Sequence, residues 1–390
     1  MTLRGTAAIV GVGELKPVRH TSGQGPLDLI GEVGRLALED AGLSFGAVDG
    51  LLVDPINENP ILVPSSVAEY LGLHVTFAEI VDLGGATGAG MVWRAAAAIA
   101  AGQCETCLCV CAAPREGIGF GWARHLRPPP TSNEMQFELP YGAGGANFGY
   151  AMIAKRYEHE YGLKAEHRAK IAVDQRTNAC ANPLAYFHGQ PITVEDVLSS
   201  PVILDPLHML EIVMPTGGGA ALVVTSAERA RKLRSQPAYL LGAGEHVTHK
   251  SITYAPSLTN SPIKLAADRA FDQAGAARSD VKMASVYDCY TITVMVSLED
   301  AGFCGKGEAG EFVASHDLTF EGDFPINTHG GQLSFGQPGM AGGMSHVTEG
   351  ARQVMGTCDK RQIPDCDLVY VNGNGGIMSE QVSLILGRSP

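Results

Sequence analysis

Apolar runs of strand length alternate along this chain with longer segments whose apolar residues recur at helical spacing. Residues 7–12 predict a buried strand, and residues 27–41 predict an amphipathic helix that ends at Gly42, a residue suited to a helix C-cap. Residues 48–53 predict the next strand. Strands that alternate with helices favour an α/β fold with largely parallel sheets.

The second part of the chain repeats this order of elements. A strand, a helix and a strand are predicted over residues 238–242, 263–274 and 281–287. Each part also has a helix that is entered from glycines and followed by a strand. These are residues 88–102 and 106–112 in the first part, and residues 342–356 and 368–372 in the second. The repeat predicts two similar layered units that pack against each other.

We expect these two halves to span residues 1–235 and 236–390, with an insertion at about 115–210 in the first half. The insertion predicts one helix at 148–161 and another at 167–178. We expect it to cover one end of the first half, where insertions commonly form substrate lids and subunit contacts.

The 390 residues carry a net charge of −13, which argues against a nucleic-acid surface because no cluster of Lys and Arg offsets it. The chain has 9 cysteines, an odd number, and no signal-peptide pattern at its start, so we expect a reducing cytoplasm with free thiols. No apolar run reaches about 18 residues, so we expect no membrane span.

Four cysteines lie close together, at Cys104, Cys107, Cys109 and Cys111. They contain a C-x-x-C pair, but no second Cys/His pair follows at the spacing of a zinc site, so we expect no metal. Cys107, Cys109 and Cys111 alternate along a predicted strand and share one of its faces. We interpret them as small buried hydrophobic residues.

A glycine-rich turn at residues 84–90 joins a predicted strand at 77–81 to the first Ala-rich helix. Such an elbow gathers backbone N–H groups and the positive end of the helix dipole at one point, which suits an anion or a nucleophile. Its only hydroxyl is Thr87, which would need an adjacent base to attack, and it contains no thiol. Covalent catalysis by cysteine at this bend is therefore not expected.

Five motifs follow one another along the chain. They are residues 84–90, Tyr287-Asp288-Cys289-Tyr290-Thr291, Asn327-Thr328-His329-Gly330-Gly331, Gly336-Gln337-Pro338-Gly339 and Asn372-Gly373-Asn374-Gly375-Gly376. In this order they resemble the thiolase superfamily, and within it the branch of thiolase-like lipid-transfer and steroid side-chain proteins. The resemblance implies a five-layer α-β-α-β-α fold, a dimer and acyl-CoA thioester substrates.

Three departures from the family pattern decide the expected chemistry. A thiolase of this branch carries its acyl-accepting Cys where Gly85 stands, and its two catalytic His residues where Tyr287 and Gln337 stand. Thioester exchange needs a thiolate and a base that generates it. Neither remains at its family position.

The resemblance makes Tyr287 the expected base, since it takes the place of a catalytic His. A phenol has a pKa near 10 and needs neighbouring groups to act near neutrality, and Asp288 and His329 are the expected partners. Gln337 and the backbone N–H of Gly85 are the expected oxyanion donors.

Further candidates surround these residues. His329 lies beside two glycines that permit close approach to a ligand, and it could relay a proton or serve a structural role. His346 lies one turn into the following helix near the same loop, where it could belong to the site or have a surface or capping role. Asn327 could fix a water or the loop itself. Cys289, Cys358 and Cys366 are interpreted as structural.

The chemistry that fits is retro-aldol cleavage of a β-hydroxyacyl-CoA to a shorter acyl-CoA and an aldehyde or ketone. Thiolase-like steroid side-chain aldolases resemble this chain in their Tyr-Asp motif and Asn-Thr-His-Gly-Gly loop. They place a second tyrosine after that loop, where this chain has Phe335. Two alternatives are an acetyl-CoA acetyltransferase with a different nucleophile, such as Thr87, and a non-catalytic subunit that binds acyl-CoA or lipid.

The resemblance also implies the binding partners. We expect a homodimer and a small partner protein with an OB-fold and a zinc ribbon, and no cofactor beyond the coenzyme A of the substrate. Arg115, Arg124 and Arg127 in the insertion are candidates for phosphate contacts, or are solvated surface charges.

Overall fold

The computed structural model describes residues 3–56, 61–115, 130–234 and 236–390. Within them, nine strands form one sheet in the order β3-β2-β4-β7-β1-β8-β11-β10-β9. The first five of these strands come from the first part of the chain and the other four from the second. Antiparallel pairing of Ala8 with Tyr239 and of Ile9 with Ala238 joins the two groups.

The first half supplies β1 (Ala7–Glu14), α1 (Pro26–Asp40), β2 (Gly50–Val53), α2 (Val63–Leu71), β3 (Phe77–Ile80), α3 (Thr87–Ala100), β4 (Thr106–Ala113), β7 (Gly218–Ser226) and α8 (Ala227–Leu233). The second half supplies β8 (Ala238–Val247), α9 (Ile263–Ala274), β9 (Met283–Val286), α10 (Thr291–Ala301), α11 (Ala309–Ser315), α12 (Gly331–Phe335), α13 (Ala341–Met355), β10 (Leu368–Gly375) and β11 (Glu380–Gly387).

The two halves share one topology. In the first, β2 is parallel to β4, which pairs antiparallel with β7 and through it with β1. In the second, β9 is parallel to β10, which pairs antiparallel with β11 and through it with β8. Strand β3, at one edge of the sheet, has no counterpart in the described part of the second half. The predicted repeat is therefore present, while the exact division at residue 235 stays a prediction.

The expectation of largely parallel sheets is wrong. Only the pairs β2–β3, β2–β4 and β9–β10 are parallel, and the other pairs in the sheet are antiparallel. The physical reason is that each half ends in a strand that returns beside its predecessor, and such a strand needs no crossover helix. One of these returning strands, β7, is not among the strands that the sequence pattern predicts.

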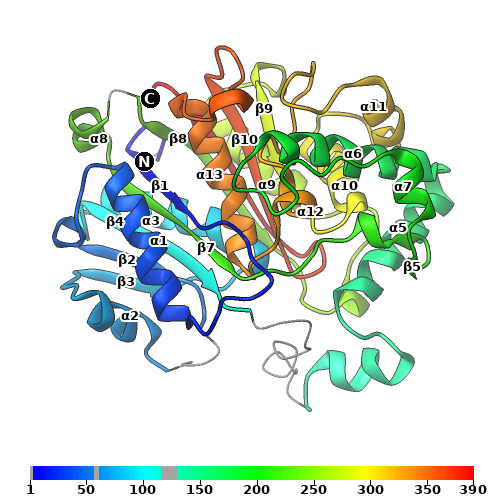
Figure 1. Cartoon of the computed structure of the whole chain (residues 1–390), viewed down its shortest axis with the longest axis horizontal. Coiled ribbons are helices and arrows are strands. Elements are labelled where there is room, and N and C mark those ends of the chain that lie inside the picture. Colours follow the sequence, from blue (N-terminus) through cyan, green and yellow to red (C-terminus); the bar gives the residue numbers. More distant parts are fainter. Residues whose placement is uncertain (1–2, 57–60, 116–129, 235) are drawn as a thin grey trace.

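Helices α3 and α13 pack against each other and against strands of both halves, in the middle of the molecule (Figure 1). Their shared core includes Cys107, Cys109 and Cys111, which confirms that these cysteines share one buried face of β4. Helices α1 and α9 cover the outer faces of the two strand groups. This is the five-layer α-β-α-β-α arrangement that the resemblance implies.

A glycine pair on the first strand of each half lets the outer helix approach closely. A Cβ on Gly13 would lie 2.3 Å from the carbonyl oxygen of Val33 in α1, and a Cβ on Gly244 would lie 2.0 Å from that of Ala266 in α9. Gly11 and Gly242 show the same close approach two residues earlier. These pairs are a sign of the duplication that the sequence pattern alone did not single out.

The insertion contains α5 (Ala146–Tyr161), α6 (Ala165–Ala181), α7 (Val194–Ser199) and the short strands β5 (Val202–Leu204) and β6 (Leu207–His208). Contrary to expectation, the described helices of the insertion pack on the second half. Figure 1 shows the green helices α5, α6 and α7 on the side that carries α10 and α11, and both α5 and α6 contact α10. Polar contacts contribute to this packing, because side chains of α6 and of Asn182, directly after it, hydrogen-bond residues 326–334 of the second half.

No helix in the described ranges is both long and apolar enough to cross a bilayer.

Candidate active site

The side chain of Tyr287 occupies the space beside the glycine elbow. Tyr287 directly follows β9, and Gly85 lies in the turn that leads into α3. A Cβ built on Gly85 would lie 2.2 Å from Cε2 of Tyr287 and 2.3 Å from its Cζ and Oη. The tyrosine ring therefore fills the volume that any side chain at position 85 would need, including the cysteine that the resemblance places there.

A cavity of about 280 Å³ opens at this point. It brings together Gly85, Tyr287 and Gln337, three of the site residues predicted from the sequence. Asp54 after β2 and Arg115 after β4 line the same cavity. Strands β2, β4 and β9 each take part in a parallel pair, and the site lies at their carboxyl ends, where α/β folds commonly bind ligands.

The C-terminal glycine motif, residues 372–376, packs closely against the backbone of the elbow. A Cβ on Gly375 would lie 1.9 Å from the carbonyl oxygen of Leu83, and a Cβ on Gly373 would lie 2.8 Å from Cα of Ala86. The backbone N–H of Tyr287 donates to the carbonyl oxygen of Asn372 at 3.1 Å. Strand β10 thus fixes both the elbow and the residue that faces it.

Burial raises the pKa of Tyr287 above its ordinary value, and the neighbouring Cys289 and Asp288 raise it further. Hydrogen bonds from the side chains of Gln332 and Gln337 oppose this rise in pKa. The phenol is therefore protonated at neutral pH, and hydrogen bonds from the two amide groups stabilise its ionised form.

Asp288 does not line the cavity, although it neighbours Tyr287 in sequence. Its carboxylate accepts the backbone N–H groups of Gln332 at 2.8 Å and Leu333 at 3.1 Å, at the N-terminus of α12. It also lies 3.1 Å from Nε2 of His346, and both side chains are fully buried. Asp288 therefore affects the phenol through its charge, which raises the pKa of Tyr287, while its direct contacts are with α12 and His346.

His346 is fully buried in α13 beside the Tyr287 ring, so a surface role for it is wrong. Its Nδ1 is 3.1 Å from the hydroxyl of Ser285, and its Nε2 is 3.2 Å from Nε2 of Gln332. Its ring centroid lies 5.8 Å from that of Tyr287. Gln332 links this histidine to the phenol. It was not predicted as a site residue, because a glutamine at this position has no distinctive sequence pattern and only the fold of α12 places it here.

His329 is buried against His346 and does not line the cavity. Its ring centroid is 5.1 Å from that of His346 and 5.5 Å from that of Phe335. Neither ring nitrogen has a hydrogen-bond partner among the described residues. Burial lowers the pKa of His329 well below its ordinary value, so the ring is neutral at pH 7.

Asn327 and Thr87 have structural contacts that account for their side chains. The amide of Asn327 accepts the N–H of Val286 at 2.8 Å and donates to its carbonyl at 2.9 Å, which fixes the end of β9. The hydroxyl of Thr87 is buried, accepts the N–H of Leu83 at 3.0 Å and faces Met340. Neither residue lines the cavity.

The cysteines near the site are protonated at neutral pH. Burial raises the pKa of Cys289 to about 12 and that of Cys366 to about 12, and it raises the pKa of Cys358 as well. A thiol with such a pKa is a poor nucleophile. Within the described ranges, no group of three or more His, Cys, Asp or Glu is placed to hold a metal ion.

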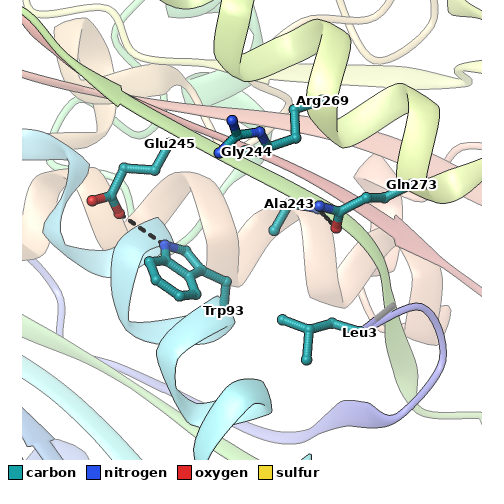
Figure 2. A pocket seen from close by; sticks show the side chains of 7 residues that line it. All are labelled: Leu3, Trp93, Ala243, Gly244, Glu245, Arg269 and Gln273. Atoms are coloured by element: carbon teal, nitrogen blue, oxygen red, sulfur yellow. Dashed lines mark hydrogen bonds between the residues drawn. The ribbon is translucent and has the colours of Figure 1, made fainter. Parts of the chain in front are cut away.

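A second cavity, of about 170 Å³, lies between α3, β8 and α9 (Figure 2). Figure 2 shows the indole N–H of Trp93 donating to the carboxylate of Glu245, at 2.8 Å. Arg94 pairs with the same carboxylate at 2.7 Å. None of the predicted site residues lines this cavity, so the candidate site is the larger cavity.

Two of the arginines predicted to contact phosphates, Arg124 and Arg127, lie outside the described residues.

The neutral state of His329 predicts a pH dependence of stability. A histidine whose pKa is lower in the folded than in the unfolded protein stabilises the fold fully above about pH 6.5, and this stabilisation falls as the pH drops below that value. The replacement His329→Leu should therefore make the free energy of unfolding less sensitive to pH between 6.5 and 5, by up to about 1.4 kcal/mol per pH unit.

Urea unfolding at several pH values measures this difference. The buried carboxyl of Glu349 pairs with Arg361, and its pKa is lowered to about 2. Its stabilising effect is complete above about pH 4.5 and changes with pH only below that value, outside this window. Equal pH slopes for the wild type and His329→Leu would contradict a neutral buried His329.

Comparisons with known proteins agree with this geometry. A family model described as "Thiolase C-terminal domain-like" matches residues 244–388. The chain is 36% identical to the "Steroid side-chain-cleaving aldolase" of Thermomonospora curvata, over 99% of this chain and 98% of that one. It is 35% identical to the "17-hydroxy-3-oxo-4-pregnene-20-carboxyl-CoA lyase" of Mycobacterium tuberculosis, over 99% of this chain and 100% of that one.

A solved structure described as "Ltp2-ChsH2(DUF35) aldolase" matches with a TM-score of 0.89 at 35% identity. The match covers 99% of this chain and 98% of that one.

Proposed function

The chain belongs to the thiolase superfamily, in the branch that includes steroid side-chain-cleaving aldolases, and from this premise we propose how its site acts. It is a carbon–carbon lyase that cleaves a β-hydroxyacyl-CoA thioester by a retro-aldol reaction. Our proposal concerns the groups that carry the reaction: Tyr287 as base, with Gln337 and the backbone N–H of Gly85 as oxyanion donors.

One observation carries this assignment. The phenol of Tyr287 stands where a side chain at position 85 would be, in a cavity that Gln337 also lines. An acyl-enzyme needs a nucleophile at the elbow, and the described residues place none there, since Thr87 is buried against Leu83. A proton acceptor beside an amide donor suits cleavage without a covalent intermediate.

The reaction balances within this site. The ionised Tyr287 oxygen takes the proton of the β-hydroxyl, a carbonyl forms at Cβ, and the electrons of the Cα–Cβ bond pass into a thioester enolate. The Gln337 amide and the Gly85 N–H hold the enolate oxygen. The proton on Tyr287 then returns to Cα, which releases a shorter acyl-CoA and an aldehyde or ketone and restores the base.

Asp288, His346 and Gln332 act as positioning residues in this proposal. Asp288 anchors α12 and His346, and Gln332 connects His346 with the phenol. This arrangement holds the tyrosine oxygen in place and supplies a hydrogen bond that favours its ionised form. His329 as a proton relay stays a prediction, since its neutral ring contacts His346 and not the cavity.

The binding partners are also proposed. Coenzyme A enters as part of the substrate, and no separate cofactor is needed for the steps above. A second copy of the chain could pair along β3, an edge strand of the described sheet. A small OB-fold and zinc-ribbon protein is a proposed partner, and the neighbour described as "Ltp2-ChsH2(DUF35) aldolase" supports a complex of that kind.

A substrate screen tests the function. The protein, alone and with a partner of the DUF35 kind, is incubated with a series of β-hydroxyacyl-CoA esters, and the release of aldehyde or ketone is measured. Intact-protein mass spectrometry during turnover reports any acyl adduct. Release without an adduct supports the proposal, an adduct on any residue supports the acetyltransferase alternative, and no turnover of any ester supports a binding subunit.

Removal of the oxyanion donor should slow the reaction strongly. In Gln337→Ala the amide is lost while the backbone of the loop is kept, so we expect kcat to fall by about 10²–10³. Gln103→Ala, at an exposed position remote from the cavity, is the matched control and should change nothing. A Gln337→Ala enzyme with unchanged kcat would remove Gln337 from the mechanism.

A further inference from the structure

Several donor groups in and beside the cavity have no hydrogen-bond partner. Arg115 lines the cavity, and its Nε is buried without a hydrogen-bond partner among the described residues. The hydroxyl of Thr216, which also lines the cavity, and Nε of Arg19, which lies beside the lining residues and not among them, likewise have no partner there. Nη1 of Arg19 donates one hydrogen bond, to the thioether sulfur of Met214 at 3.4 Å, and a thioether is a weak acceptor.

The positive charges of Arg115 and Arg19 repel each other, and a bound anion would offset this repulsion. Burial lowers the pKa of Arg115, and the neighbouring Arg19 lowers it further, so two like charges lie close together. The ion pairs of the described residues include neither arginine. Asp54, directly after β2, is a carboxylate that lines the same cavity. Both arginines are half-buried, and their buried Nε donors without a partner destabilise a protein unless a ligand satisfies them.

Arg115 is close to the reacting groups. The carbonyl oxygen of Gln337 accepts the N–H of Thr216 at 3.0 Å. The next residue, Gly217, approaches Arg115 so closely that a Cβ on it would lie 2.9 Å from the Arg115 backbone nitrogen. A group bound by Arg115 therefore belongs to the substrate fragment beside the reacting carbons. The phosphates of coenzyme A are separated from those carbons by the whole pantetheine arm.

We propose that Arg115, assisted by Arg19 and Thr216, binds a carboxylate on the acyl chain of the substrate. The substrate class is then a β-hydroxyacyl-CoA thioester that carries a second, free carboxylate. This inference rests on the proposed function for the position of the reacting carbons. A guanidinium matches a carboxylate with two parallel hydrogen bonds, and the Thr216 hydroxyl adds a third donor.

Equilibrium binding tests this separately from turnover. The probes are two acyl-CoA esters of equal length without the β-hydroxyl, so that they cannot be cleaved: one ends in a free carboxylate and the other in its methyl ester. The wild type should bind the carboxylate at least about 10-fold more tightly, as expected for hydrogen bonds to a charged group. Arg115→Gln should abolish this preference, and Arg115→Lys should retain part of it.

Controls separate the possible sources of the anion. Arg35→Gln, at an exposed ion pair of α1, should keep the preference. The same two acyl groups on pantetheine, which lacks the nucleotide phosphates, should show the same preference for the carboxylate.

Two results would overturn the proposal. One is equal binding of both esters by the wild type. The other is a loss of affinity in Arg115→Gln that is the same for both esters and disappears with pantetheine, because it would assign Arg115 to a phosphate. Failure of the cleavage screen with a retained carboxylate preference would instead contradict the retro-aldol mechanism alone. A thermal unfolding curve verifies that each variant is folded.

Discussion

The replacement Tyr287→Phe is expected to reduce kcat for carbon–carbon cleavage by about 10²–10⁴ while acyl-CoA binding is retained. The change removes one oxygen and leaves the ring that packs against Gly85, so the elbow keeps its shape. Only the group that takes the β-hydroxyl proton is lost. Aldehyde or ketone release gives kcat, and binding of an uncleavable ester gives the affinity.

Tyr370→Phe is the matched control. Tyr370 is also fully buried, and its hydroxyl contacts Ser383 at 2.9 Å within the second half, away from the cavity. It should leave kcat unchanged and report only the effect of removing a buried hydroxyl. Similar activity of Tyr287→Phe and Tyr370→Phe would exclude Tyr287 as the base.

The same residue predicts the pH profile of the reaction. Because burial raises the pKa of Tyr287, the reactive ionised form is the minor one at neutral pH. The logarithm of kcat should therefore rise with pH with a slope near one across the neutral range, and activity should fall as the pH falls. The residual activity of Tyr287→Phe should lack this slope.

The second large effect is expected at the elbow. In Gly85→Ala the new Cβ would overlap the Tyr287 side chain, with two ring carbons and the hydroxyl oxygen within 2.3 Å. Either the tyrosine or the elbow must move, so we expect cleavage to be lost and the protein to be destabilised by about 1–3 kcal/mol. Chemical denaturation measures the stability, and product release measures the activity.

Two further variants show whether the clash is the cause. Gly144→Ala adds a methyl group where no atom lies within 4 Å, so it should be close to neutral. In a Tyr287→Ser background the ring that is struck is absent, so adding Gly85→Ala should cost little further stability, while activity stays absent. If Gly85→Ala is fully active, the close contact between Gly85 and Tyr287 is not required for function.

Much of the fold follows from local patterns. Helix α9 has the bounds predicted from its apolar spacing and its terminal Gly275. Strand β4 and helix α13 differ from their predicted limits by one residue. These elements are long and strongly periodic, so their sequence is enough to define them. The returning strand β7 and the short helix α12 were missed because neither carries a distinct period or capping signal.

The candidate site divides in the same way. The resemblance led to Gly85, Tyr287 and Gln337, and the structure places all three around one cavity. It could not show that Asp288 faces away toward His346, that His329 is shielded by Phe335, or that Gln332 belongs to the site. Successive residues at a strand end point to opposite sides, and only packing decides which side holds the ligand.

By itself, the sequence determined the alternation of strands and helices, the duplication of the half, and the absence of a thiol at the elbow, because periodicity and residue identity are local properties. The tertiary structure alone decided that the Tyr287 ring fills the space above Gly85, and that Arg115 shares its cavity. These residues lie far apart along the chain, and contact between such residues depends on how helices and strands pack, which no local pattern encodes.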